Sequence, residues 1–487
     1  MMTMRNVLKA GLGPTHKISF LCTLIGLSIV GLGVYLRFYQ LDFQAYEYDE
    51  LWSIGASAKG SLAEVFPILR GEGTPPTYQI ILWQWIKHTG VDPTSTRSLS
   101  ALFDSVGILL SFLLARRILN NISLIAFSVL ISFSCFAITF AQETRTYSLL
   151  LLFAWLSTLS FTRYSLQRDV QKGDPNPAKP YTWMLVFNFC LSAIHPYGNL
   201  LALAEYLAIY LTNWKGGLKP FSIRGLVFQA LTFLPTIAWY LVSPPDPKRI
   251  SWIPKPDAEF FDYTFTLFLG THYLAIAAIA LGMLLLLQWS RREGDRPPER
   301  DVIFSLLGIY SFIILLPCLV SQVKPIVDER YLIVSLPSLY LFLAILTGTF
   351  SRSLTKTIGV AALLIVLFAQ GSLMSVEMPW TERFKANWDR AVIAADSTIK
   401  KRHLPVYVPD KLDGWEPQEM ILGRHLGPLH IIEERRPLPE EFLLMDAEHV
   451  AQDKMEAELS QRGYDCSEIG SFYHSYVIDC TRKVSKH

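Results

Sequence analysis

The chain has 487 residues, of which 51% are hydrophobic and only 18% are charged. This composition is too apolar for an ordinary soluble enzyme. The formal net charge of +2 argues against a nucleic-acid-binding protein, because such proteins carry a concentrated basic face. The six cysteines form no CxxC pair and no Cys/His cluster at zinc-ligand spacing. The sequence therefore predicts an integral membrane protein.

Eleven apolar runs are candidates for membrane spans, since about 20 mostly apolar residues cross the ~30 Å of hydrocarbon. They lie near 18–36, 98–115, 122–141, 146–162, 182–195, 198–213, 225–242, 263–289, 302–320, 331–350 and 355–374. The first run is long enough to be an uncleaved anchor rather than a signal peptide. The run at 76–88 is apolar and aromatic but, at ~1.5 Å per residue, it reaches only about two-thirds of the way across. We expect it to lie in the interface.

The basic residues of the short loops test this arrangement, because cytoplasmic loops carry an excess of Lys and Arg. Arg5, Lys9 and Lys17 place the N-terminus in the cytoplasm. With eleven spans, the remaining strongly basic short loops also fall on the cytoplasmic side. Counting 76–88 as a further span would place basic loops on both sides of the membrane. The segments expected outside are loop 37–97, loop 142–145, the turn at His195-Pro196, loops 243–262 and 321–330, and the tail 375–487.

The tail differs from the rest of the chain in composition. Apolar residues from Phe384 to Ile399 recur at three- and four-residue steps, which predicts an amphipathic helix. Strand-like runs follow at 404–408, 429–432 and 442–445, and a charged helix-like run lies at 449–462. This pattern indicates a small α/β domain. Cys466 and Cys480 flank two strand-like stretches, and they form either a disulfide in an oxidising periplasm or two unpaired thiols.

The clearest candidate for chemistry is the segment EYDELWS (47–53) in the first outside loop. Asp49 and Glu50 are tandem carboxylates beside the membrane surface, which suits a general base or ligands of a divalent cation such as Mg²⁺ or Mn²⁺. Acidic residues are also typical of the first turn of a helix. Both interpretations remain open at this point.

Charged residues also occur in two very short outside segments. Glu143 and Arg145 lie in QETRTY (142–147), where they serve either a site or an interfacial salt bridge. His195 lies in the turn between two spans. A lone histidine there is more often a satisfied interfacial residue than a ligand.

Two further positions carry the same ambiguity. Lys324 and Arg330 lie at the mouth of a span, where they bind an anion or anchor the chain at the membrane surface. Glu205 lies near the middle of a span. Intramembrane carboxylates are functional candidates, and a protonated or hydrogen-bonded structural role is the alternative.

Taken in chain order, these segments resemble the polytopic GT-C glycosyltransferases, particularly the branch of protein O-mannosyltransferases and lipid A aminoarabinose transferases. The resemblance is carried by YDELWS (48–53), PPTYQIILWQW (75–85), RSLSALFDSVGILLSFLLARRI (97–118), AQETRTYSLLLL (141–152), HPYGNLL (195–201) and ERYLIVSLPSLYLFLA (329–344). Members commonly carry a His where this chain has Thr74, so a contact from that position is in doubt. The tail adds nothing to the resemblance.

The resemblance implies transfer of a sugar from a polyprenyl-phosphate donor to a lipid, protein or polysaccharide acceptor. The reaction would take place on the outer face of the inner membrane, usually with inversion. It implies that Asp49 is the general base and that Glu50 positions it or contacts the acceptor. Some branches use a divalent cation, for which Asp49 and Glu50 are the candidate ligands, and others do not.

The same resemblance extends to the groups around the donor. It implies phosphate binding by Arg145, Arg330 and Lys324. Three further side chains would contact the sugar or support those that do: Glu143, His195 and Tyr78.

The expected architecture is an α-helical polytopic membrane domain of GT-C type over 1–374, with about 11 transmembrane helices, and a small extracytoplasmic α/β domain over 375–487. One alternative is a lipid transporter or flippase. The chain has no repeat between its halves, and its acidic residues concentrate in one outside loop, which favours the enzyme. The other alternative is an inactive relative whose tail binds envelope components. Loss of the loop carboxylates is expected there, yet Asp49 and Glu50 are present.

Overall fold

The computed structural model describes residues 20–169, 178–213, 223–250, 253–270, 299–349, 368, 378–380, 385, 388–407, 438–447, 452–472 and 475–483. The predicted strand at 429–432 lies outside these residues, as do most of the predicted spans at 263–289 and 355–374. The chain divides into two compact units. The first holds 1–39, 61–81 and 97–378, and the second holds 40–60, 82–96 and 379–487. The domain boundary predicted at 374/375 stays a prediction.

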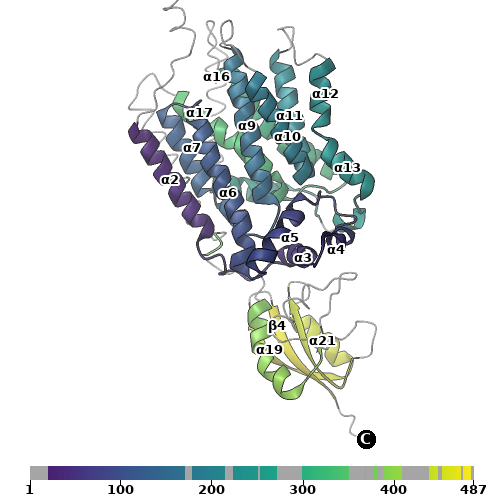
Figure 1. Ribbon diagram of the computed structural model, residues 1–487. Helices are drawn as coiled ribbons and strands as arrows, with labels where there is room; N and C mark the ends of the chain where they lie inside the picture. Colours follow the sequence, from purple (N-terminus) through teal and green to yellow (C-terminus); the bar gives the residue numbers. More distant parts are fainter. Residues whose placement is uncertain are drawn as a thin grey trace, which may run out of the picture. The chain divides into compact units, whose positions relative to one another are not determined.

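The first unit is a helical bundle (Figure 1). Its long helices are α2 (Phe20–Phe38), α6 (Pro93–Ala115), α7 (Asn121–Phe133), α9 (Tyr147–Asp169), α10 (Ala178–Ile194), α11 (Pro196–Asn213), α14 (Ala258–Leu269), α16 (Glu299–Ser321) and α17 (Leu336–Thr349). Shorter helices are α4 (Leu62–Ile68), α5 (Thr77–Thr89), α8 (Cys135–Ala141), α12 (Ile223–Leu231) and α13 (Leu234–Val242), with 3-10 helices η2 (Pro247–Ile250) and η3 (Glu329–Ser335).

Among the described residues, five helices are long and apolar enough to cross a membrane, and up to seven if each of two bent pairs is one span. The bent pairs are α7 with α8, at 46°, and α12 with α13, at 48°. The multi-pass helical fold is therefore confirmed, whereas the count of about eleven spans is not. The run at 76–88, predicted to lie in the interface, forms α5, a helix of 13 residues that is not among the candidate spans.

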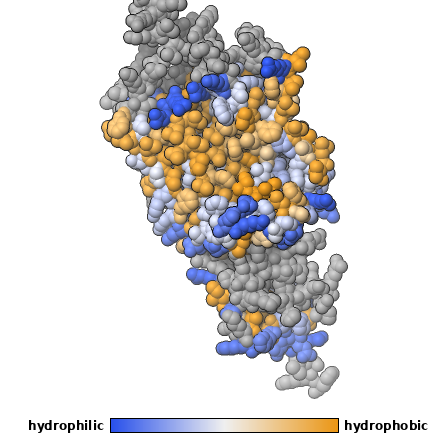
Figure 2. All heavy atoms as spheres, in the orientation of Figure 1, coloured by the Kyte–Doolittle hydropathy of each residue, from blue (hydrophilic) through white to orange (hydrophobic). Residues whose placement is uncertain are grey.

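Large apolar side chains cover the outer surface of this bundle. Those on α2 and on the α12–α13 pair include Leu24, Leu32, Phe228 and Leu241, all exposed. Figure 2 shows the resulting apolar surface over the helices. Soluble proteins rarely expose apolar patches of this extent. The helices satisfy their own backbone hydrogen bonds, which is the condition for facing lipid.

The break between α7 and α8 lies at Ser134. The Ser134 hydroxyl accepts a hydrogen bond from the Ala137 amide at 3.2 Å and thereby caps α8. It also accepts one from the Tyr340 hydroxyl of α17 at 2.9 Å. The predicted span at 122–141 is thus two helices, and a contact from a distant helix stabilises the junction.

The second unit contains a four-stranded sheet in the order β1-β2-β4-β3. The strands are β1 (Val406–Tyr407), β2 (Glu441–Ala447), β3 (Tyr464–Phe472) and β4 (Ser475–Arg482), with helices α19 (Trp388–Arg402) and α21 (Gln452–Gln461). Strands β1 and β2 are parallel, and the other two pairs are antiparallel. The unit also holds α3 (Tyr48–Ser57) from the first loop. The predicted α/β tail is confirmed.

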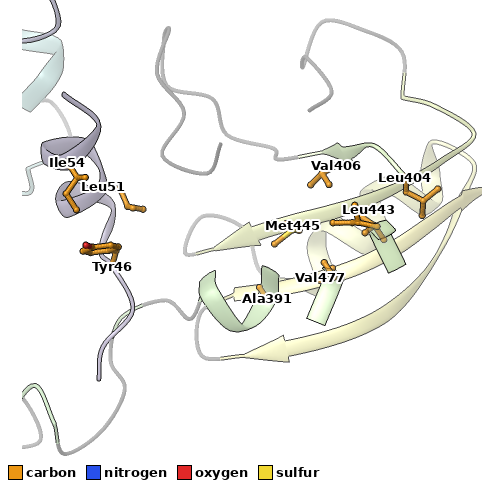
Figure 3. Packing of buried hydrophobic residues seen from close by; sticks show 11 residues of the cluster. Tyr46, Leu51, Ile54, Ala391, Leu404, Val406, Leu443, Met445 and Val477 are labelled. Carbon is orange, nitrogen blue, oxygen red and sulfur yellow. The ribbon is translucent and has the colours of Figure 1, made fainter. Parts of the chain in front are cut away.

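Alternating residues of β2 point to opposite faces of this sheet, as the two-residue period of a strand requires. Leu443 and Met445 belong to a buried cluster with α19, and the first-loop residues Leu51 and Ile54 belong to the same cluster (Figure 3). Phe442 and Leu444 belong to a second cluster, with α21. Both faces of the sheet are therefore covered by a helix.

Cys466 and Cys480 lie directly opposite each other on β3 and β4. They form a disulfide, with their Cα atoms 4.1 Å apart. The bridge closes the β3–β4 hairpin. Of the two alternatives for these cysteines, the disulfide is confirmed.

Candidate active site

The segment EYDELWS forms the start of α3, so its interpretation as a helix start is confirmed. Glu47 is the N-cap, and Glu50 closes a capping box by accepting the Glu47 amide at 3.1 Å. Asp49 lies in the first turn and is partly exposed, whereas Glu50 is fully buried. Adjacent helical residues point about 100° apart. The two carboxylates therefore occupy different environments, and Asp49 is the one partly accessible to solvent.

Glu50 is tied to the segment that precedes α19. The Lys385 ammonium lies 3.0 Å from Glu50 Oε2, and both side chains are buried. Gln44 strengthens this connection, because its Nε2 donates to the Pro379 carbonyl at 2.8 Å and its Oε1 accepts the Lys385 amide at 3.4 Å. These contacts lie within the second unit.

The same contacts bear on the predicted metal role of Asp49 and Glu50. Glu50 Oε2 already accepts from an ammonium and an amide, so a metal ion on that oxygen would lie against the Lys385 charge. In the part of the chain that the structure describes, no group of three or more His, Cys, Asp or Glu side chains is placed to hold a metal ion. The paired-carboxylate metal site does not fit Glu50 as the structure has it.

In the first unit, three sequence segments meet in an aromatic cluster around His195. The His195 ring centroid lies 5.1 Å from that of Tyr331, 5.7 Å from that of Tyr197 and 6.4 Å from that of Tyr147. The Arg145 guanidinium carbon lies 5.7 Å from the Tyr147 ring centroid, within the range of a cation–π contact. The fold thus brings together Arg145 and His195, two of the predicted site residues.

His195 lies in the turn between α10 and α11. Burial, followed by the positive charge of Arg145, lowers its pKa to about 3. Its Nδ1 accepts the Tyr197 amide at 3.2 Å. The ring is therefore neutral at physiological pH with its proton on Nε2, and Arg145 supplies the positive charge of this cluster.

Close packing of two helices fixes this turn. A Cβ at Gly198, in the first turn of α11, would lie 2.6 Å from the Leu191 carbonyl oxygen of α10. Only glycine permits this approach. The Tyr197 hydroxyl donates to the Ile326 carbonyl at 3.0 Å and connects the turn to the segment before η3.

The backbone of Arg145 is held by α6. The Ser100 hydroxyl contacts the Arg145 carbonyl at 3.2 Å and the Tyr78 hydroxyl at 2.9 Å. Tyr78 is fully buried and supports this connection from α5. Glu143 is also buried, and its carbonyl accepts the Arg145 amide at 2.8 Å within the short loop.

Arg330 and Lys324 differ in their surroundings. Arg330 is partly exposed, and its Nε donates to Asp328 at 2.8 Å. Asp328 also caps η3 by accepting the Arg330 amide at 3.1 Å. Lys324 is exposed, six residues before Arg330 and outside the aromatic cluster defined above.

A buried ion pair joins α2 to α6. Arg37 of α2 pairs with Asp104 of α6, and both are fully buried. Arg37 also donates to the carbonyls of Gly33, Ser132 and Ile131 at 2.8, 3.1 and 2.9 Å. The last two are carbonyls at the C-terminal end of α7 that would otherwise lack helical partners.

Gln142 connects α2 to loop 142–145. Its Nε2 donates to the carbonyls of Leu36 and Tyr39 at the end of α2, at 3.0 and 2.9 Å. Arg37 therefore holds the end of α7, and Gln142, three residues before Arg145, holds the end of α2. The sequence interpretation did not include either contact.

Glu205 is fully buried on α11 and hydrogen-bonded to neighbouring helices. It accepts from Ser157 at 2.7 Å, Asn188 at 3.1 Å and Thr158 at 3.2 Å. Glu205 is therefore a hydrogen-bonded carboxyl, as its structural alternative requires. The network joins α9, α10 and α11, whose ends carry Tyr147 and His195.

Sequence reasoning missed the tyrosines of the aromatic cluster, although a signal for them existed. Each of the segments RTY, HPY and RY places a tyrosine one or two residues after a basic or histidine residue, in a segment predicted to lie outside. Tyr147, Tyr197 and Tyr331 are the three tyrosines. No local pattern in the sequence indicated Lys385 as a partner of Glu50.

The described bundle, with α5, its capped first-loop helix and its α/β tail, shares its fold with two crystal structures of ArnT from Cupriavidus metallidurans. The structure bound to undecaprenyl phosphate has a TM-score of 0.59 at 12% sequence identity, and the match covers 93% of this chain and 97% of that chain. The apo structure has a TM-score of 0.61 at 13% identity, with the same coverage. No protein-family model and no curated protein matches the chain.

Proposed function

We propose that the chain is a membrane glycosyltransferase that transfers a sugar from a polyprenyl-phosphate donor to a hydroxyl acceptor. The observation that carries this proposal is the fold shared over 93% of the chain with ArnT, one structure of which is bound to undecaprenyl phosphate. Fold alone does not define an activity, so the site residues must supply the chemistry.

In this proposal Asp49 is the general base. Its carboxylate takes the acceptor hydroxyl proton while the acceptor oxygen attacks the anomeric carbon with inversion. The bond from that carbon to the donor phosphate oxygen breaks, and polyprenyl phosphate leaves with the electron pair. The partial exposure of Asp49 in the first turn of α3 supports this role, since a base must reach its substrate.

Arg145 and Arg330 bind the leaving phosphate, whose negative charge grows in the transition state. A guanidinium suits this task because it presents a planar fork of donors to a phosphate. The neutral state of His195 supports the assignment of Arg145, because Arg145 is then the charged residue of the cluster. The Nε2–H of the neutral His195 ring is a hydrogen-bond donor for the sugar. Lys324 stays a candidate for a peripheral phosphate contact, and Glu143 and Tyr78 support the Arg145 loop.

The test is a transfer assay with the purified protein in lipid vesicles. Radiolabelled polyprenyl-phosphate sugars are offered with a total envelope extract, and Asp49→Asn is compared with the wild type. Asp42→Asn is the matched control, because Asp42 is an exposed carboxylate in the same loop. We expect labelled product from the wild type and from Asp42→Asn. The transfer rate of Asp49→Asn should be lower by about 10²-fold or more, while its donor binding should be unchanged.

Two results would overturn parts of this proposal. Near-normal transfer by a folded Asp49→Asn protein would remove Asp49 as the base. No product from any donor, together with movement of the labelled donor across the bilayer, would replace the transferase with a flippase.

A further inference from the structure

The segment before α19 is bound to the first loop at three points. Lys385 pairs with Glu50 through its side chain and contacts Gln44 through its backbone, and Gln44 also binds the Pro379 carbonyl. Lys385 is only 6% exposed and Glu50 is 0% exposed. A buried ammonium and carboxylate stay charged only while they face each other, so loss of one partner leaves an uncompensated charge.

Glu50 Oε2 receives two donors from different parts of the chain. The Glu47 amide closes the capping box at 3.1 Å, and Lys385 Nζ lies on the same oxygen at 3.0 Å. The capping box alone fixes where α3 begins. The contact with Lys385 additionally fixes the rotation of the first turn about the helix axis, because it holds the Glu50 side chain toward the Lys385 ammonium.

Asp49 precedes Glu50 in the same turn, so the rotation that points Glu50 inward also sets the direction of the Asp49 carboxylate. The Ser53 hydroxyl donates to the Asp49 carbonyl at 2.9 Å, which holds the Asp49 backbone within the turn. The Glu50 anchor therefore sets the direction in which the Asp49 side chain leaves the helix.

We propose that Lys385 is a positioning residue for the transfer reaction: through its buried ion pair with Glu50 it fixes the first turn of α3 and orients the carboxylate of Asp49. This inference rests on the proposed function, in which Asp49 is the base. It gives the segment leading into the C-terminal domain an indirect part in catalysis, through the orientation of Asp49.

The first test compares Lys385→Met with Lys385→Arg and with the control Lys401→Met. Lys401 is an exposed lysine near the end of α19. Displacement of a catalytic group by about 1 Å costs roughly 10²-fold in rate, so Lys385→Met should lower kcat by about that factor and leave the donor KM within about twofold. Lys385→Arg restores the charge and should recover most of kcat, and Lys401→Met should match the wild type.

A second measurement does not depend on activity. Hydrogen exchange of the full-length protein in detergent reports the amides of 48–52 in α3, which should exchange faster in Lys385→Met and not in Lys401→Met. If Lys385→Met misfolds, the double variant Lys385→Met/Glu50→Gln removes the uncompensated charge and takes its place in both measurements.

The outcomes separate this inference from the function on which it rests. Wild-type transfer with an unchanged kcat in folded Lys385→Met would overturn the positioning role and leave the transferase in place. Absence of transfer by the wild type would overturn the proposed function. In that case the hydrogen exchange still tests the anchoring of α3, and unchanged exchange of the amides of 48–52 in Lys385→Met would overturn it.

Discussion

The buried pair of Arg37 and Asp104 allows a quantitative prediction from a double-mutant cycle. Arg37→Met leaves the Asp104 carboxylate buried without its cation, and Asp104→Leu leaves the guanidinium buried without its anion. Removing one partner of a buried ion pair costs about 3–5 kcal/mol. We therefore expect each single variant to lower the free energy of unfolding by about that amount, so that simple addition predicts about 6–10 kcal/mol.

The double variant Arg37→Met/Asp104→Leu removes both charges. What it loses is the three hydrogen bonds from Arg37 to the carbonyls of Gly33, Ser132 and Ile131. At about 1 kcal/mol each, this amounts to about 3 kcal/mol. The coupling energy between the two positions is therefore expected to be at least about 3 kcal/mol, well above the ~0.5 kcal/mol within which independent sites add.

Unfolding in mixed detergent and dodecyl sulfate micelles, followed by the fluorescence of the 12 tryptophans, measures these free energies. Arg224→Met is the control, because Arg224 is an exposed arginine of the bundle and its loss should change stability by less than about 0.5 kcal/mol. Additive single variants, with a coupling energy below about 0.5 kcal/mol, would refute the reasoning.

Two further predictions concern pH and redox state. His195 has a pKa of about 3 in the folded protein and about 6.5 in the unfolded chain, so the unfolded chain binds its proton first and stability should fall as the pH drops from about 6.5 toward 3. His195→Phe should flatten the stability curve between pH 7.5 and 4.5 in urea or micelle titrations, and parallel curves would contradict the lowered pKa. The Cys466–Cys480 disulfide closes a loop with a sequence separation of 14, which stabilises the tail by about 3 kcal/mol on loop-closure entropy. Cys466→Ser should therefore increase limited proteolysis of the tail, whereas Cys190→Ser should not, and equal cleavage rates would refute the stabilisation.

Hydrophobic length predicted the positions of most helices because a span must satisfy its backbone internally and present apolar side chains to lipid. The bend between α12 and α13 was not predicted, although Pro235 at the start of α13 is a local signal for it. The break at Ser134 had no such signal. Serine does not interrupt a helix by itself, and the contacts at the junction come from Tyr340 and Arg37, which are distant in sequence.

The candidate site was predictable only in part, for the same reason. Arg145 and His195 were predicted to lie in short segments outside the membrane, and the structure brings these two residues together around Tyr147. The ion pair of Glu50 with Lys385 joins positions 335 residues apart, and one sequence gives no signal for such a pairing. Local patterns identified which residues lie at helix ends, and tertiary contacts decide which of those residues meet.

The chain shares its fold with ArnT at 12–13% identity, and its own positions differ in how much sequence change they accept. A lipid-facing position requires only an apolar side chain, so Leu24 or Phe228 can be exchanged for many residues without cost. The Arg37–Asp104 pair, the Glu205 network and Gly198 require particular atoms at particular distances. A fold held by a few such polar contacts between otherwise interchangeable apolar helices can diverge below the reach of sequence comparison while its helices keep their arrangement. The residues that make these polar contacts, rather than the apolar residues on the outer surface, therefore carry the information about the fold.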